Sequence, residues 1–266
     1  MNIMDIKKNL FQNVIEDYDY GRPQYPEELY TAVSRFSGIA SASEILEVGA
    51  GTGQATDLFA AHGHHLDLLE VSEQQVAFLQ GKYGEQDDIK VIKSYFEDYE
   101  PDKQYDLIYS ATAFHWIKCE NGYPKAWRML REDGTMAVFW NVFFDLYHSG
   151  GIFDGLNELR KTYMPNESLG DDLETIKEKR IRQITVGGYF DTPEYIEFHW
   201  TDQYDAKRFA ALMGTESKAL ALSAQQRTAY LQNIERYILE QGGVVDVPQT
   251  VSLYLMKKSA RNGRNV

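Results

Sequence analysis

The 266-residue sequence predicts an α/β fold built on a mainly parallel β-sheet. From about residue 43 to 142, short apolar runs alternate with segments of helical periodicity, which is the pattern of repeated β-α-β units. A glycine-rich turn directly follows the first apolar run, and an acidic residue ends the second. These observations favour an open sheet that binds a nucleotide-like ligand at the carboxyl ends of its strands.

Seven segments have the length and composition of β-strands. Five of them lie in the region already described, and two follow in the C-terminal half. The predicted strands are 45–48, 66–69, 89–92, 106–109, 136–140, 195–200 and 251–256. Residues 150–185 are rich in charge and mostly helical in pattern, and 205–241 is also helical. The sequence therefore predicts a helical insertion after the fifth strand.

Local signals mark helix starts and a turn within this pattern. Pro26 precedes an amphipathic segment at 27–36, and a proline is tolerated there because the first helical N–H needs no partner. Ser72, followed three residues later by Gln75, has the spacing of a capping box. The Glu-Asp-Gly sequence at 132–134 predicts a turn before the fifth strand.

Charge and composition limit the classes of partner. Forty acidic residues against 27 basic ones give a net charge of −13, which disfavours nucleic acid and other polyanions. Clustered positive charge occurs only near the C-terminus, where we interpret it as a solvated tail (Lys257, Lys258, Arg261 and Arg264). The single Cys119, the absence of a signal-like N-terminus and the absence of a long apolar run favour a cytoplasmic protein away from membranes. The sequence does not predict an oligomeric state.

The sharpest motif is the segment 45–53, which reads Ile-Leu-Glu-Val-Gly-Ala-Gly-Thr-Gly. Glycines at such a turn permit positive φ and let the backbone approach a ligand closely, although a simple tight turn would also use them. A dinucleotide fingerprint needs a third glycine five residues after the first. Counted from Gly49 that position is Gln54, and counted from Gly51 it is Thr56. The motif therefore argues against a nicotinamide dinucleotide.

Two acidic residues point to another ligand. Glu47 precedes the glycines at the end of the first strand, where a carboxylate suits a cationic ammonium better than a pyrophosphate. S-adenosylmethionine carries both an ammonium and a sulfonium. Glu70 ends the second strand 17 residues after Gly53, where nucleotide-binding folds place an acid on the ribose hydroxyls. An alternative is that Glu70 only caps the helix that starts near Ser72.

With these motifs combined, residues 44–141 resemble the class I S-adenosylmethionine-dependent methyltransferases. Two further motifs resemble the small-molecule branch that includes trans-aconitate methyltransferase-like enzymes. They are Tyr18-x-x-Gly21-Arg22-Pro23-x-Tyr25-Pro26 and Phe114-His115-Trp116. The resemblance implies a Rossmann-like three-layer sandwich with a seven-stranded, mainly parallel sheet, an antiparallel last strand and a helical insertion after strand 5.

The resemblance also implies a set of cofactor contacts. Glu47 and the glycines would surround the methionine end, Glu70 would bind the ribose, and residues 95–97 would lie against the adenine. Many relatives have aspartate where this chain has Tyr95, so the adenine contact here would use stacking or the backbone. The full predicted set is Tyr18, Arg22, Glu47, Gly49, Ala50, Gly51, Thr52, Gly53, Glu70, Val71, Tyr95, Phe96, Glu97 and Ala111.

The loop after the fourth strand should face the transferred methyl group. His115 is the candidate catalytic residue, as a general base or as a group that holds a substrate carboxylate or hydroxyl. Alternatively, it only shapes the pocket. Trp116, Trp140 and Phe144 are candidates for the substrate wall or the core. Arg22 would touch the cofactor carboxylate or an anionic substrate, unless it is a surface residue.

We therefore predict methyl transfer from S-adenosylmethionine to a small-molecule acceptor, with a carboxylate or a hydroxyl as the acceptor group, by direct displacement. A protein that binds S-adenosylmethionine or S-adenosylhomocysteine without catalysis is the alternative, and a nicotinamide-dependent oxidoreductase is the third interpretation. No metal site is predicted, because His62, His64 and His65 lack the ligand spacing of zinc sites.

The sequence shows no internal repeat and no obvious linker, so we predict one methyltransferase domain over residues 1–266. Its predicted parts are an N-terminal helical lid (1–40), a cofactor-binding core (41–142), an insertion on the substrate side (143–200), C-terminal helices with the last strand (201–258) and a tail (259–266).

Overall fold

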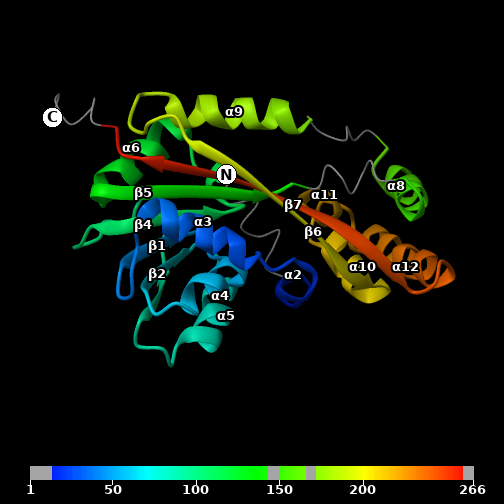
Figure 1. Ribbon diagram of the computed structural model, residues 1–266. Helices are drawn as coiled ribbons and strands as arrows, with labels where there is room; N and C mark the ends of the chain where they lie inside the picture. Colours follow the sequence, from blue (N-terminus) through cyan, green and yellow to red (C-terminus); the bar gives the residue numbers. More distant parts are fainter. Residues whose placement is uncertain (1–13, 143–149, 166–171, 260–266) are drawn as a thin grey trace. The chain divides into compact units, whose positions relative to one another are not determined.

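Residues 14–142, 150–165 and 172–259 are described by a computed structural model of the chain (Figure 1). The chain divides into two compact units, and each is described by itself. The first contains residues 1–23, 142–173 and 199–250, and the second contains 24–141, 174–198 and 251–266. The interpretation of the chain as one domain stays a prediction.

A seven-stranded sheet runs in the order β3-β2-β1-β4-β5-β7-β6. Its strands are β1 (Glu44–Val48), β2 (His65–Glu70), β3 (Ile89–Lys93), β4 (Tyr105–Ala111), β5 (Leu130–Asn141), β6 (Glu194–Asp205) and β7 (Val244–Lys257). The pairs from β3 through β5 are parallel, and β7 is antiparallel to β5. With its flanking helices, this sheet confirms the predicted Rossmann-like α/β fold with an antiparallel last strand and helices inserted after strand 5 (Figure 1).

The strand order reverses between β1 and β4, because β1 has β2 on one side and β4 on the other. Open α/β sheets bind ligands at the carboxyl ends of the strands beside such a reversal. Residues 45–48 of β1 and 66–70 of β2 are buried without alternation. Continuous burial is expected of parallel strands that are covered by helices on both faces. The sequence therefore places the glycine loop at the reversal point.

The predicted turn at 132–134 is wrong. These residues lie inside β5, where the pairing with β4 shifts register. Leu130 pairs with Tyr105, whereas the next regular pair joins Thr135 to Leu107. Four residues of β5 therefore oppose a single residue of β4. The Glu-Asp-Gly sequence is accommodated as an irregularity within a long strand, which local turn preference alone does not predict.

Six helical segments belong wholly or almost wholly to the second unit. They are α3 (Glu27–Ser37), α4 (Gln54–Ala60), α5 (Glu73–Tyr83), the 3₁₀ segment η1 (Phe114–Trp116), α6 (Cys119–Met129) and α9 (Leu173–Thr185). The α3 helix follows Pro26, as predicted, and ends at Gly38 with a left-handed φ of 75°. Ser72 caps α5 by accepting from the Gln75 N–H at 3.5 Å, which confirms the serine half of the predicted capping box.

In the described part of the first unit, five helices pack around a core of their own. The helices are α2 (Ile15–Gly21), α8 (Ile152–Tyr163), α10 (Ala206–Gly214), α11 (Ser217–Leu220) and α12 (Ala224–Glu240). Helix α12 starts with a complete capping box of Ser223 and Gln226. Gly21 lets α2 touch α10, because a Cβ there would lie 2.5 Å from the Leu212 backbone nitrogen. Buried aromatic and aliphatic side chains from Phe153 to Val247 form this core.

The interpretation of Lys257 and Lys258 as part of a solvated tail is wrong. Lys257 ends β7, and its ammonium donates to the carbonyl of Asp133 at 2.9 Å. Lys258 donates to the carbonyl of Leu130 at 2.9 Å and lies over the Trp127 ring at 4.3 Å. Both ammonium groups therefore hold the strand end in place. Arg261 and Arg264 lie outside the described residues.

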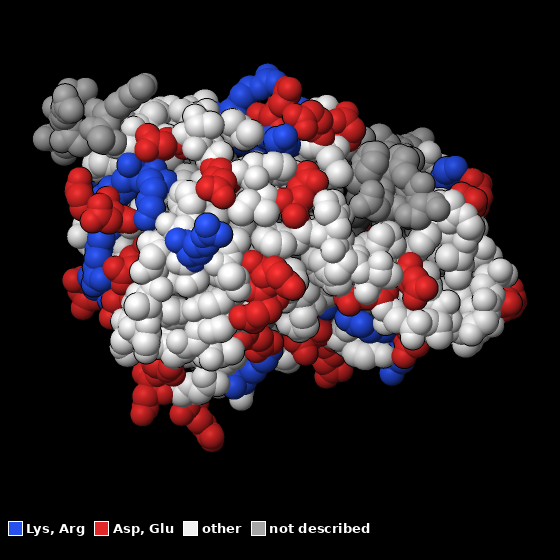
Figure 2. Space-filling view, in the orientation of Figure 1, with Lys and Arg blue, Asp and Glu red and all other residues white. Residues whose placement is uncertain are grey.

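Acidic side chains are spread over the face seen in Figure 2, and the Lys and Arg side chains on it gather only in small groups. Within the described ranges, no helix is long and apolar enough to cross a membrane. The same part of the chain contains no group of three or more His, Cys, Asp or Glu side chains arranged to hold a metal ion.

Candidate active site

The glycine loop, residues 49–53, joins the carboxyl end of β1 to α4. The N–H groups of Gly49 and Ala50 both donate to the carbonyl of Leu69, at 2.9 and 3.0 Å, and tie the loop to the end of β2. The N–H of Gly53 closes a turn onto the carbonyl of Ala50 at 2.9 Å, and α4 begins at the next residue. The loop is therefore fixed at the reversal point of the sheet.

The three glycines of the loop all have positive φ, but their surroundings differ. A Cβ on Gly49 would lie 2.5 Å from the Ala113 Cβ, and a Cβ on Gly53 would lie 2.6 Å from the Tyr83 hydroxyl. A Cβ on Gly51 would meet only one side-chain nitrogen, 4.0 Å away. Gly49 and Gly53 are thus required by packing, whereas the space beside Gly51 is open to a ligand.

Glu47 is 1% exposed and has no cationic partner among the described residues. Its Oε2 accepts from the Thr56 hydroxyl at 2.5 Å and from the Tyr109 hydroxyl at 2.8 Å. Burial raises the pKa of this carboxyl to about 7, and the two hydroxyl donors offset only part of that rise. A cation placed beside it would favour the ionised form. This is the environment expected for a group that meets a ligand ammonium.

Glu70 is 6% exposed and accepts backbone hydrogen bonds with both oxygens. Oε2 accepts from the Gly51 N–H at 3.0 Å, and Oε1 accepts from the N–H groups of Val71 and Ser72 at 2.8 and 2.9 Å. Burial raises the pKa of Glu70, and these backbone donors act in the opposite direction. A carboxylate has about four acceptor positions, so roughly one remains for a ligand hydroxyl. Glu70 therefore orders the glycine loop in addition to any contact with a ribose.

The segment 95–97 follows β3 and lies on the same edge of the sheet. The N–H of Ser94 donates to the carbonyl of Glu70 at 3.1 Å, so the segment is anchored at the end of β2. Phe96 is 3% exposed and packs edge-on against Phe114, with ring centroids 5.8 Å apart. One buried carboxylate oxygen of Glu97 has no hydrogen-bond partner in the described structure. A donor such as an amino group of a ligand base would satisfy it.

Three other residues of the predicted cofactor set, Ala50, Thr52 and Ala111, also lie in the second unit, where their side chains pack against the protein. Thr52 is fully buried, and its hydroxyl exchanges hydrogen bonds with the side chain of Gln54. Ala50 is 5% exposed, and Ala111 ends β4 opposite Phe139 of β5. Their side chains shape the loop and the strand end, so any ligand contact would use the main chain.

Thr112, directly after β4, has a φ of 52° although it is β-branched. Such a conformation is strained and is found most often at functional sites. Its N–H donates to the carbonyl of Phe139 at 2.7 Å, and its hydroxyl lies 3.2 Å from that of Tyr25. The Asn141 amide donates to the same tyrosine hydroxyl at 3.3 Å. These three polar residues meet where β4 and β5 end, and no local sequence signal indicates the strain at Thr112.

His115 lies in η1 and is exposed, and its Nδ1 accepts from the indole N–H of Trp140 at 3.0 Å. The Trp116 ring lies 4.4 Å from the His115 ring. Trp140 is 7% exposed, and the guanidinium of Arg180 from α9 stacks over it at 4.2 Å. The structure therefore brings together three predicted site residues and adds Arg180. Sequence reasoning missed Arg180 because nothing in a charge-rich helix distinguishes it from its neighbours.

Tyr18 and Arg22 belong to the first unit. Arg22 donates to the Thr215 hydroxyl at 2.9 Å and to the Thr215 carbonyl at 3.0 Å, and it lies over the Tyr18 ring at 4.8 Å. These bonds give Arg22 a structural role inside that unit, and its contact with a cofactor or an anionic substrate stays a prediction. Phe144 lies outside the described residues.

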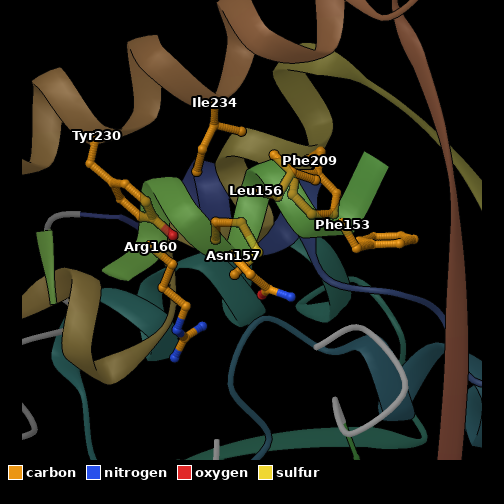
Figure 3. A pocket seen from close by; sticks show the side chains of 8 residues that line it. Phe153, Leu156, Asn157, Arg160, Phe209, Tyr230 and Ile234 are labelled. Atoms are coloured by element: carbon orange, nitrogen blue, oxygen red, sulfur yellow. The ribbon is translucent and has the colours of Figure 1, made fainter. Parts of the chain in front are cut away.

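The first unit contains a small hollow of its own (Figure 3). Its lining residues come from α8, α10 and α12, and they are Phe153, Leu156, Asn157, Arg160, Phe209, Met213, Tyr230 and Ile234. The enclosed space of about 10 Å³ holds roughly one water molecule. Arg160 is 8% exposed, and its guanidinium pairs with the carboxylate of Glu216 at 2.7 Å. The charge in this hollow is therefore already balanced by the protein.

Comparison with known proteins finds a methyltransferase domain within the chain. Residues 45–134, which span the glycine loop and the first four strands, match the family model of a methyltransferase domain. The match identifies a methyltransferase domain over these residues, about a third of the chain. This methyltransferase is 22% identical to an uncharacterised methyltransferase of Mycobacterium tuberculosis over 228 residues, which cover 86% of this chain and 85% of that protein.

Two solved structures share the fold of this methyltransferase. A structure assigned to a type II methyltransferase of Anaeromyxobacter dehalogenans has a TM-score of 0.61 and 17% identity, covering 90% of this chain and 97% of that chain. A methyltransferase of Thiobacillus denitrificans in complex with S-adenosylhomocysteine has a TM-score of 0.54 and 14% identity, covering 92% and 97%. These likenesses confirm the predicted methyltransferase fold, whereas the small-molecule branch stays a prediction.

Proposed function

We propose that this methyltransferase transfers the methyl group of S-adenosylmethionine to a small-molecule acceptor by direct displacement. The proposal rests mainly on the glycine loop, where the space beside Gly51 is open. Two buried carboxyls stand near the ends of the strands at this loop, Glu47 in β1 and Glu70 in β2, and neither has a cationic partner among the described residues. Buried carboxyls are normally paired with a cation or fully hydrogen-bonded. A ligand that carries an ammonium and ribose hydroxyls supplies both kinds of partner.

Each end of the cofactor has a candidate partner in this edge of the sheet. Glu47 would stay ionised beside the methionine ammonium, and Glu70 would use its remaining acceptor position for a ribose hydroxyl. The unpartnered oxygen of Glu97 would accept from the adenine amino group, which adds a side-chain contact to the stacking or backbone bonds expected at Tyr95. Gly51 would let the backbone approach without a Cβ in the way.

The acceptor would lie near the carboxyl ends of β4 and β5, beside His115, Trp116 and Trp140, while the predicted wall residue Phe144 lies outside the described residues. When bound, the cofactor supplies an electrophilic methyl group on a good leaving group. The protein's task is then to align the acceptor and exclude water, since alignment alone contributes about 7–11 kcal/mol. We propose a carboxylate or a hydroxyl as the acceptor group. The net charge of −13 supports a small substrate rather than nucleic acid. The single cysteine supports a cytoplasmic location.

Calorimetric titration with S-adenosylmethionine, S-adenosylhomocysteine and NADH tests the cofactor site. We expect wild type to bind both sulfur compounds and not NADH, and Glu70→Ala to lose at least tenfold in affinity. Glu73→Ala is the matched control, because this nearby carboxylate is 79% exposed and its ion pair with Lys93 is exposed on both sides. Absence of binding by both sulfur compounds would overturn the proposal. Binding without transfer of a tritiated methyl group into a metabolite extract would favour a non-catalytic binding protein.

A further inference from the structure

The hydrogen bond between Trp140 and His115 fixes where the histidine carries its proton. An indole nitrogen always donates and never accepts. Its N–H lies 3.0 Å from Nδ1 of His115, so Nδ1 must present a lone pair. A neutral imidazole has one protonated and one unprotonated nitrogen, and its proton must therefore be on Nε2.

The surroundings of Trp140 hold this arrangement in place. The indole is 7% exposed and packs edge-on against Tyr254 of β7, with ring centroids 5.8 Å apart. Arg180 covers the ring with its guanidinium at 4.2 Å, and it also donates to the side-chain oxygen of Gln183 at 3.1 Å. A cation over the ring draws electron density toward itself and makes the indole N–H a stronger donor. The donor is thus fixed in position and strengthened.

Both nitrogens of His115 are then unsuited to remove a proton from a substrate. The lone pair of Nδ1 is engaged by Trp140, and Nε2 already carries a proton. Protonation of Nδ1, or a switch to the other tautomer, would set an N–H against the indole N–H and break the bond. His115 can instead donate through Nε2 to an atom that carries a lone pair.

We infer that His115 is a hydrogen-bond donor to the methyl acceptor rather than a general base, and that Trp140 is the residue that positions it. The inference rests on the proposed methyl transfer. The acceptor then presents an oxygen lone pair to His115, and its nucleophilic atom carries no proton that this histidine must remove. A lone pair of the acceptor forms the bond to the methyl carbon, the electron pair of the carbon–sulfur bond stays on sulfur, and His115 stays neutral.

Nuclear magnetic resonance of the ¹⁵N-labelled, deuterated protein tests the hydrogen bond without requiring any activity. We expect a cross-peak through the hydrogen bond that joins the Trp140 indole nitrogen to Nδ1 of His115, together with a protonated Nε2. Histidine signals are assigned by their loss in His115→Gln. Trp140→Phe should abolish the cross-peak, and Trp116→Phe is the matched control that should retain it. A proton on Nδ1 in wild type, or no cross-peak, would overturn the inference.

Arg180→Gln provides a second variant in case Trp140→Phe does not fold. It removes the cation and leaves the indole, so we expect a weaker cross-peak and an unchanged tautomer. Absence of both the cross-peak and the protonated Nε2 signal, in a protein that still binds S-adenosylhomocysteine, would reject the inference and leave the proposed function standing.

Transfer of a tritiated methyl group into a small-molecule extract supplies the activity arm. A glutamine amide can place an N–H near the position of imidazole Nε2. His115→Gln should therefore keep most of the rate that His115→Ala loses, with the alanine variant about tenfold slower, as for the loss of one ordinary hydrogen bond of about 1.4 kcal/mol. Equal loss in both variants would indicate a base and overturn the inference.

Discussion

Two buried charged sites in this methyltransferase differ in how their charge is balanced. In the first unit, Arg160 is 8% exposed and is paired with Glu216 at 2.7 Å. In the second unit, Glu47 is 1% exposed, and its hydrogen-bond donors among the residues that the structure describes are the hydroxyls of Thr56 and Tyr109. A buried pair completed by the protein is a structural feature, whereas a buried carboxyl without a cation suits a site completed by a ligand. The comparison shows how burial and pairing together separate a structural charge from a binding site.

The largest expected effect is in the first unit. Arg160→Met removes the cation that pairs with the largely buried Glu216 carboxylate and should lower the free energy of unfolding by about 3–5 kcal/mol. Denaturant unfolding measures the loss. The double variant with Glu216→Leu should recover part of it, because both charges are then removed. An unchanged midpoint in the single variant would show that the pair is not structural.

The second prediction concerns two glycines with similar backbone conformations. Gly51 has a φ of 62° and Gly38 a φ of 75°, and neither has protein atoms that a Cβ would clash with. Alanine at either position should cost about 1–2 kcal/mol of stability through the left-handed conformation. Only Gly51→Ala should also weaken S-adenosylhomocysteine binding, by tenfold or more in calorimetric titration. Equal affinity for S-adenosylhomocysteine in the two variants would show that the ligand does not occupy the space beside Gly51.

The third prediction follows from the pKa of Glu47, which burial raises to about 7 from an ordinary value of 4.5. Between these values the folded protein binds more protons than the unfolded chain, so this carboxyl's contribution to stability is lost as pH rises from about 4.5 through 7. The side chain of Glu47→Gln stays neutral at every pH. Between pH 5 and pH 8, wild type should therefore lose up to about 3 kcal/mol more unfolding free energy than Glu47→Gln does. Chemical denaturation at both pH values measures this.

The affinity for S-adenosylhomocysteine sharpens the same prediction. If the ligand ammonium meets Glu47, binding should tighten as pH rises through 7 in wild type and much less so in Glu47→Gln. Parallel pH profiles of affinity for the two proteins would show that Glu47 does not contact the ligand ammonium. The prediction for the stability effect of Glu47 would still stand.

The smallest effect is expected at Glu73, whose ion pair with Lys93 is exposed on both sides. Glu73→Gln should change stability by less than about 0.5 kcal/mol and should leave cofactor affinity unchanged. A thermal melt and a titration check both. A large loss of affinity here would mean that net charge near the loop, rather than the buried carboxyls, governs binding.

The sequence was sufficient to predict the strands and the glycine loop, because these depend on short-range patterns. Parallel strands covered on both faces are continuous apolar runs, as in β1 and β2, and the capped start of α5 is encoded within four residues. The spacing of Glu47, the glycines and Glu70 predicted the cofactor from the same local information. Their specific contacts with it stay a prediction.

Only the tertiary structure decided which partner each polar group has. The donor that fixes the His115 tautomer comes from Trp140, 25 residues away, and the cation over that indole comes from a different helix. The same holds for Lys257 and Lys258, whose ammonium groups bind carbonyls more than a hundred residues earlier in the chain. Local patterns determine secondary structure because they act over one or two turns. Hydrogen-bond partners and burial depend on which distant segments the fold brings together, and no local pattern specifies that.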